Sequence, residues 1–193
     1  MKRRTFITAS VLPIAGLSGC LGDTEYQVTN TAIKASLDPL SLSARLAVAD
    51  ATIERPAALT LTLENTTDDP IRIRSYGSWP FGVLALAPSP TPGEDTRRTT
   101  LFSPSYETTD RVEVDRGGSS LSVDGTPITQ PLDAGESVTR RYELHGDDIP
   151  NAGTYYIVEK FDGQASRYSR DDDWRTLEYQ LRLSIDEKRR LPM

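Results

Sequence analysis

AALTLTLENTTDDPIRIRS, residues 57–75, is the stretch that decides the fold. The leucines of residues 59–63 alternate with threonines, which is the pattern of a strand with one buried and one solvated face. Residues 65–70, NTTDDP, have the chemistry of a turn, and IRIR at 71–74 then resumes the alternation. We therefore predict that residues 57–75 form an antiparallel pair of strands.

Similar short segments recur from about Gln27 onward, separated by residues that favour turns. The proline-rich residues 88–93 must lie outside the sheets, because proline lacks the N–H that a ladder requires. No segment has a sustained helical period, so eight or nine short strands predict an all-β, antiparallel β-sandwich. The other expected strands are 40–48, 81–87, 112–114 and 121–123 (a hairpin around Gly117 and Gly118), 137–144, 154–161 and 176–185.

A local signature indicates which kind of sandwich to expect. Residues 151–155, NAGTY, resemble the turn and tyrosine that open strand F of immunoglobulin-like domains, the tyrosine corner. Position 157, where an antibody domain has its second cysteine, is isoleucine, and the single cysteine of the chain cannot close an internal disulfide. We therefore expect an immunoglobulin-like sandwich that is held together by its hydrophobic core alone.

The first twenty residues have the layout of a signal peptide. A basic start is followed by an uncharged, mildly apolar stretch, residues 6–17, which is shorter than the ~20 residues that a membrane span needs. Arg3, Arg4 and Phe6, in the sequence RRTFI, resemble the twin-arginine export motif. The following residues, Leu17, Ser18, Gly19 and Cys20, resemble a lipobox, in which the cysteine becomes the lipid-modified N-terminus.

These motifs predict how the chain is organised. We expect a signal peptide at 1–19, the lipidated Cys20 and a linker at 20–26, the sandwich at 27–187 and a short tail at 188–193. Cys20 would then be a membrane anchor and neither a nucleophile nor a metal ligand. One acyl chain gives marginal binding, so a stable anchor implies two. The resemblance places the domain on the outer face of the cytoplasmic membrane.

The charge balance excludes one class of partner. The chain has 22 basic and 28 acidic residues, a net charge of −6, and cleavage before Cys20 would remove three basic residues and leave −9. Nucleic-acid binding needs cationic side chains that face phosphates, so we expect no nucleic-acid partner. Nearly all basic residues are arginine, a composition that suits high salt, where strong net charge costs little.

As a whole, the sequence resembles the uncharacterised lipoproteins of halophilic archaea. The features that carry the resemblance are RRTFI, LSGC, the 57–75 pair, WPFGVLAL at 79–86, and LDAGESVTRRYEL at 132–144 followed by AGTYY. The last two also resemble, more faintly, the immunoglobulin-like fold of the intracellular proteinase inhibitor family, without an inhibitory loop. The resemblance implies a fold and a location but no activity.

Residues that could carry chemistry are few. His145 is the single histidine, no G-x-S-x-G motif is present, and we expect no catalytic residue, metal or cofactor. The aspartates at 147–148 and 171–173 are oxygen-rich but lack the spacing of an EF-hand loop. Asn65 begins an N-T-T sequon on a predicted surface loop, which makes it a candidate glycosylation site.

We therefore expect a membrane-anchored extracytoplasmic lipoprotein that acts as a non-enzymatic interaction or envelope-accessory module. Two alternatives stay open. The first is a ligand- or carbohydrate-binding lipoprotein that uses loops around Trp79 and Trp174, although core packing is the commoner use of such aromatic residues. The second is a carboxylate-based hydrolase, which requires two acids that converge in a cleft.

Overall fold

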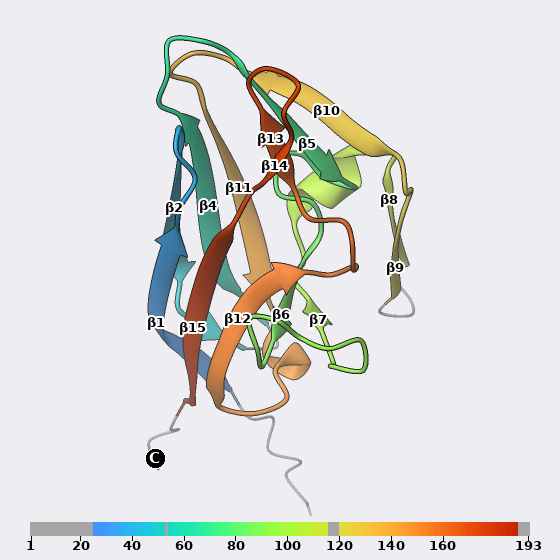
Figure 1. Ribbon diagram of the computed structural model, residues 1–193. Coiled ribbons are helices and arrows are strands. Elements are labelled where there is room, and N and C mark those ends of the chain that lie inside the picture. Colours follow the sequence, from blue (N-terminus) through green and yellow to red (C-terminus); the bar gives the residue numbers. More distant parts are fainter. Residues whose placement is uncertain (1–24, 53, 116–119, 189–193) are drawn as a thin grey trace, which may run out of the picture.

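The computed structural model describes residues 25–52, 54–115 and 120–188 (Figure 1). Its strands begin at Tyr26 and end at Glu187, and the described residues contain two short 3-10 helices and no α-helix. The all-β prediction is therefore confirmed. The elements are β1 (Tyr26–Ala35), β2 (Leu40–Val48), β3 (Asp50–Ala51), β4 (Ala57–Asn65), β5 (Ile71–Tyr76), β6 (Leu84–Ala87), β7 (Thr99–Thr100), η1 (Pro104–Thr108), β8 (Val112–Asp115), β9 (Ser120–Val123), β10 (Pro127–Leu132), β11 (Ser137–Leu144), η2 (Gly146–Asp148), β12 (Gly153–Glu159), β13 (Arg167–Ser169), β14 (Arg175–Thr176) and β15 (Tyr179–Glu187).

Two sheets enclose the main core. One has three strands in the order β11-β4-β2, and the other has six in the order β3-β1-β15-β12-β6-β7. Alternate residues of β4, such as Leu61 and Leu63, belong to the same fully buried cluster as Leu181 and Ile185 of β15. The period-2 pattern thus places one face of each strand in a shared interior, as a β-sandwich requires.

Each of the two sheets takes its strands from distant parts of the chain. β2, β4 and β11 belong to one sheet, and β6, β12 and β15 belong to the other. The tyrosine corner is also present: Tyr155, at the start of β12, donates its hydroxyl hydrogen bond to the carbonyl of Asn151 at 2.8 Å. Residues 151–155 therefore have the local geometry that their sequence predicts.

The stretch 57–75 forms two strands, but they do not pair with each other. β4 lies between β2 and β11 in the three-stranded sheet. β5 lies between β10 and β13 in a separate four-stranded sheet of order β10-β5-β13-β14. The prediction of an antiparallel pair is wrong, because alternation specifies which face of a strand is buried and not which strand is its partner.

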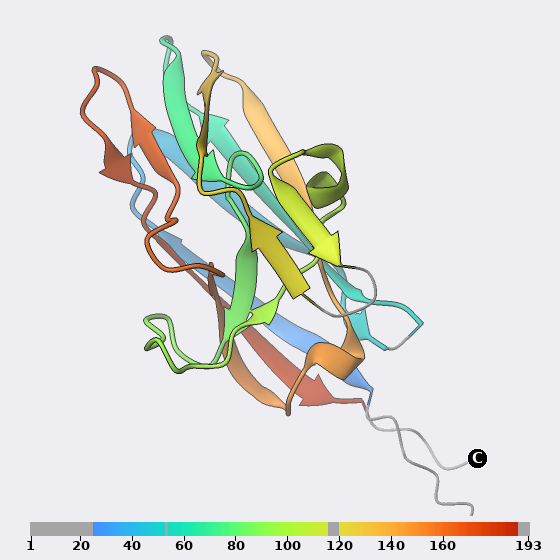
Figure 2. The same ribbon diagram turned by 90° about the vertical axis from the view of Figure 1, so that its right-hand side faces the viewer.

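Several other strand predictions are confirmed, with shifted bounds. The hairpin of β8 and β9 is present, on the right-hand side of Figure 1 and facing the viewer in Figure 2. β2 and β11 match the predicted segments 40–48 and 137–144 residue for residue. The predicted strand 81–87 is reduced to β6, since Gly82 has a positive φ of 75° that interrupts extended backbone.

Both ends of the described domain lie at one pole. The backbone N–H of Lys188 donates to the carbonyl of Glu25 at 2.7 Å, and the outer ends of β1 and β15 lie at the bottom of Figure 1. The four-stranded sheet lies at the opposite pole (Figures 1 and 2). Among the described residues, no helix has the length and apolar character needed to cross a membrane.

Candidate functional site

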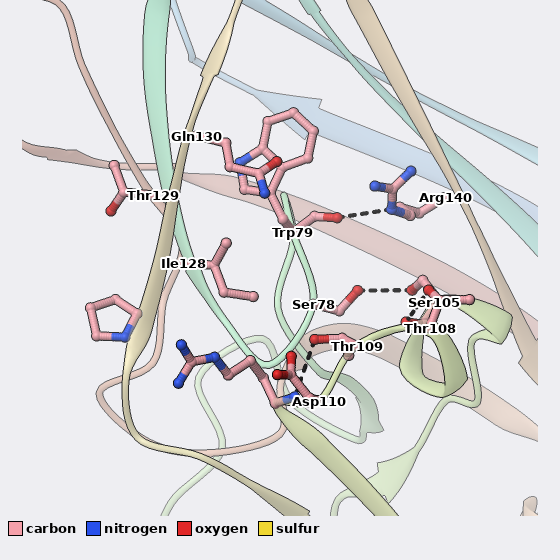
Figure 3. A pocket seen from close by; sticks show the side chains of 12 residues that line it. Ser78, Trp79, Ser105, Thr108, Thr109, Asp110, Ile128, Thr129, Gln130 and Arg140 are labelled. Carbon is pink, nitrogen blue, oxygen red and sulfur yellow. Dashed lines mark hydrogen bonds between the residues drawn. The ribbon is translucent and has the colours of Figure 1, made fainter.

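A groove of about 500 Å³ lies beside the edge strand β10 of the four-stranded sheet (Figure 3). This volume is within the usual range of small-molecule sites, which is roughly 300–1,000 Å³. We call it the Trp79 groove. It is lined by Ser78 and Trp79 before β6, by Ser105, Thr108, Thr109, Asp110 and Arg111 around η1, by Pro127, Ile128, Thr129 and Gln130 of β10, and by Arg140 of β11.

Trp79 is fixed in the wall of this groove. Its indole Nε1 donates to the carbonyl of Ile73 at 3.3 Å, and its own carbonyl accepts a hydrogen bond from Nε of Arg140 at 2.8 Å. The Arg140 guanidinium carbon lies 5.9 Å from the centre of the indole ring. The side chain is half-buried. An aromatic ring that is held in this way is available for contact without a large loss of conformational entropy.

The turn before Trp79 requires glycine. Gly77 has a φ of 76°, and a Cβ atom at this position would lie 3.0 Å from a methyl of Val112 and 3.1 Å from one of Val83. Positive φ is costly for other residues, and here the space is also filled. Gly77 therefore sets the path that carries Ser78 and Trp79 from β5 into the groove.

The floor of the groove is formed by hydroxyl groups that satisfy one another. The hydroxyl of Ser105 lies 2.8 Å from that of Ser78 and 2.8 Å from that of Ser103. Thr108 donates to the carbonyl of Ser105 at 3.0 Å. Ser78 and Ser103 are almost completely buried. Since these groups already have partners, they shape the groove and leave recognition to its more exposed side chains.

The exposed polar groups of the lining carry both charges and amides. Arg111 pairs with Asp124, whose carboxyl pKa is lowered by hydrogen bonds from Thr126 and from Arg111. Within the described residues, the side chains of Asp110 and Gln130 make no hydrogen bond. The lining thus offers free acceptors and donors beside an aromatic ring. It contains a single carboxylate, that of Asp110, whereas glycoside hydrolysis uses two.

The second tryptophan has a different environment. The guanidinium carbons of Arg74 and Arg72 lie 3.9 Å and 5.4 Å from the centre of the Trp174 ring. Arg167 donates to the carbonyl of Trp174 at 2.8 Å. Because guanidinium groups contact the ring, Trp174 is a poor platform for a sugar or an apolar ligand. The structure therefore leaves Trp79 as the candidate aromatic contact.

The acidic loops are engaged with arginines. Asp172 pairs with Arg72, and Asp173 pairs with Arg175 at 3.3 Å. Across the described part of the chain, no group of three or more histidine, cysteine, aspartate or glutamate side chains is placed to hold a metal ion. Asp172 and Asp173 therefore act in surface ion pairs.

His145 lies at the start of η2 and does not line the Trp79 groove. Two residues of η2, Asp147 and Asp148, follow it. Burial raises the pKa of Asp148, and the adjacent carboxylate of Asp147 raises it further. His145 is thus a half-buried residue at a strand end, away from the candidate site.

Asn65 does not occupy the surface position that the sequon suggested. The side chain is fully buried, and its amide nitrogen donates to the carbonyls of Asp69 at 2.8 Å and of Leu132 and Asp133 at 3.0 Å. Its oxygen accepts from both the N–H and the hydroxyl of Thr67. The expected exposure is wrong, because this amide joins two loops in the folded domain, and its nitrogen is inaccessible to a glycan.

The residues of the predicted export signal lie outside the described part of the chain. These are Arg3, Arg4, Phe6, Leu17, Ser18, Gly19 and Cys20. Of the groove, only Trp79 was indicated by the sequence as a candidate. The other lining residues are ordinary polar side chains on three further segments, and the only sequence signal for them is the pair of prolines in β10, which marks an edge strand.

Comparison with known proteins gives one relationship. A family model with the description "Domain of unknown function (DUF8130)" matches residues 1–193. Comparisons with curated proteins and with solved structures gave no match.

Proposed function

We propose that this chain, which belongs to the DUF8130 family, is a lipid-anchored module on the outer face of the cytoplasmic membrane, with a binding role and no enzymatic one. Its anchor would be the lipidated Cys20, after twin-arginine export and removal of residues 1–19. The proposal joins the two N-terminal motifs to a compact β-sandwich whose described residues hold no cluster of metal-ligating side chains.

The observation that carries the proposal is that both ends of the described domain lie at one pole, away from the Trp79 groove. Glu25 and Lys188 are hydrogen-bonded neighbours at one pole, so a tether from Cys20 would attach there. Residues 20–26 reach at most roughly 25 Å when fully extended. That pole would lie close to the membrane, and β10 and η1, which border the Trp79 groove, would lie further out (Figure 1). This arrangement suits a module that presents its binding surface outward.

The anchor is tested by expressing the full chain in a halophilic host as wild type, Cys20→Ser and, as a matched control, Ser18→Ala, which keeps a small residue in the lipobox. We expect wild type and the control in the membrane fraction, with a mature mass that begins at a lipid-modified Cys20. Cys20→Ser should be released into the medium. Cytosolic protein that retains Met1 would contradict the proposal.

A second candidate function, carbohydrate binding, is favoured by the Trp79 groove. A pyranose ring has an apolar face that packs on an aromatic ring and hydroxyls that bond to amides and carboxylates. The groove offers Trp79 together with the side chains of Gln130 and Asp110. A carboxylate-based hydrolase receives no comparable support, because the lining holds one acid where that chemistry uses two.

Binding at the groove can be measured by fluorescence, because the chain has two tryptophans. In a Trp174→Phe variant, emission reports Trp79 alone, and a saturable change with an oligosaccharide is the expected result. Trp79→Ala removes the aromatic ring from the groove and should lose most of the affinity when binding is measured by calorimetry. Release of a shortened product by the wild-type chain would contradict the non-enzymatic role.

A further inference from the structure

The Trp79 groove has two arginines in its lining, Arg111 and Arg140, against the single acid Asp110. The chain as a whole has 28 acidic and 22 basic residues. Arg140 uses Nε and one Nη atom for backbone carbonyls, so within the described residues its other Nη atom makes no hydrogen bond. Arg140 therefore has an N–H group left for a ligand, whereas Arg111 is already paired with Asp124.

The groove borders a surface that carries several arginines. Thr129 of β10 borders the groove, and its hydroxyl lies 3.4 Å from Nε of Arg74 on the neighbouring strand β5. The outward side chains of this sheet include Arg72, Arg74, Arg167 and Trp174, which we call the arginine face. A ligand that leaves the groove over β10 would meet this face next.

Two arginines of this face lie directly opposite each other. Arg74 on β5 and Arg167 on β13 are register partners. Like charges in this position destabilise a sheet. The contacts of both residues with Trp174 hold them in place: the Arg74 guanidinium stacks on the ring, and Arg167 bonds to the carbonyl. A stacked guanidinium keeps the N–H groups along its edge for an anion.

Three acids of this region are engaged with other arginines. Arg72, Arg170 and Arg175 pair with Asp172, Asp69 and Asp173, respectively. In the part of the chain that the structure describes, Arg74 and Arg167 form no ion pair. Two adjacent and unneutralised arginines on an acidic domain form a surface that is complementary to an anion.

From this arrangement we infer that the ligand is an acidic carbohydrate, a chain of uronate-type sugars with one ring against Trp79 and carboxylates on Arg74 and Arg167. The inference rests on the proposed carbohydrate-binding function of the groove. The aromatic ring and the amide of the groove would bind the sugar rings, and the arginine face would bind their carboxylates. Planar, bidentate contacts to carboxylates are the interaction that arginine makes best.

The test uses the full chain in detergent, with both tryptophans in place, and measures binding by isothermal titration calorimetry. Three probes are titrated: an oligogalacturonate, a neutral oligosaccharide of the same length, and polyglutamate as an acidic chain without sugar. The test variant is the double substitution Arg74→Gln and Arg167→Gln. The control is Arg182→Gln, which makes the same arginine-to-glutamine change on the exposed face of β15. Circular dichroism verifies that each variant is folded.

We expect the oligogalacturonate to bind most tightly, and the double variant to weaken it by about tenfold or more, since charged hydrogen bonds are lost. Arg182→Gln should leave its affinity unchanged, and added salt should reduce it. Neutral sugar that binds as well as the uronate would overturn the inference and leave the carbohydrate proposal intact. Polyglutamate that binds as well would overturn both, as would the absence of binding by any probe.

Discussion

Replacing Asn65 by alanine removes five hydrogen bonds from a fully buried side chain. The carbonyl of Leu132 loses a buried hydrogen bond, which costs about 0.5–1.5 kcal/mol. The carbonyls of Asp69 and Asp133 are nearer to solvent, and losing these bonds and those to Thr67 costs about 0.5–1.5 kcal/mol for each group. We expect Asn65→Ala to lower the free energy of unfolding by about 2–6 kcal/mol in total.

Equilibrium unfolding in urea, followed by tryptophan fluorescence, measures this loss. The midpoint should fall while the denaturant slope stays constant, because a lost buried contact changes stability and not the surface exposed on unfolding. Thr66→Ala is the matched control in the same loop. Its hydroxyl donates one exposed hydrogen bond to the carbonyl of Pro39, so the control should lose about 1 kcal/mol or less.

Asn65→Asp separates hydrogen bonding from volume. It keeps the oxygen that accepts from Thr67. Its second oxygen, however, replaces the amide nitrogen and faces the three carbonyl oxygens that accept from that nitrogen in the wild type. It should therefore be at least as destabilising as alanine. The reasoning is refuted if Asn65→Ala remains within 1 kcal/mol of wild type, or if mass spectrometry of the native protein finds a glycan on Asn65.

Three further changes test other parts of the structure. Tyr155→Phe removes the tyrosine-corner hydrogen bond and should lower stability by about 1 kcal/mol, whereas Tyr156→Phe, on the adjacent half-exposed residue, should have little effect in the same urea assay. Tyr106→Phe leaves the buried N–H of Leu84 without its acceptor and should cost about 1–3 kcal/mol; an unchanged midpoint would contradict the contact. Asp148→Asn should raise the melting temperature at pH 7, because burial raises the pKa of Asp148 and the folded state therefore disfavours its ionised form. This gain should disappear below the unfolded pKa, about pH 4, where the carboxyl is protonated in both states, and an equal gain at pH 3 would argue against it.

The strands were largely predictable, because burial of one face has a direct signature in sequence. β2, β4 and β11 follow the alternation, and Leu181, Leu183 and Ile185 are all buried as the period-2 pattern of β15 requires. Their pairing was not predictable. β4 and β5 carry the same signature in different sheets, and β10 was missed because Pro127 and Pro131 obscure an edge strand.

The candidate site was less predictable than the fold. Trp79 stands out by its chemistry, but the groove also needs η1, β10 and Arg140, which come together only through the arrangement of the sheets. The error at Asn65 has a similar origin. A turn sequence indicates a loop, and loops usually lie on the surface, but this side chain turns inward to bond carbonyls of the β4–β5 and β10–β11 loops.

The pairing of β1 with β15 has a consequence for when the domain can fold. The first long strand has the last one as its main partner, from Tyr26 opposite Glu187 to Ala35 opposite Tyr179. Such a ladder cannot close until the ribosome has released nearly the whole chain, and contacts so distant in sequence form slowly. Until then β1 and β12 present unpaired edges that favour aggregation. An export route that waits for the finished fold, as the twin-arginine motif predicts, would protect this chain during that delay.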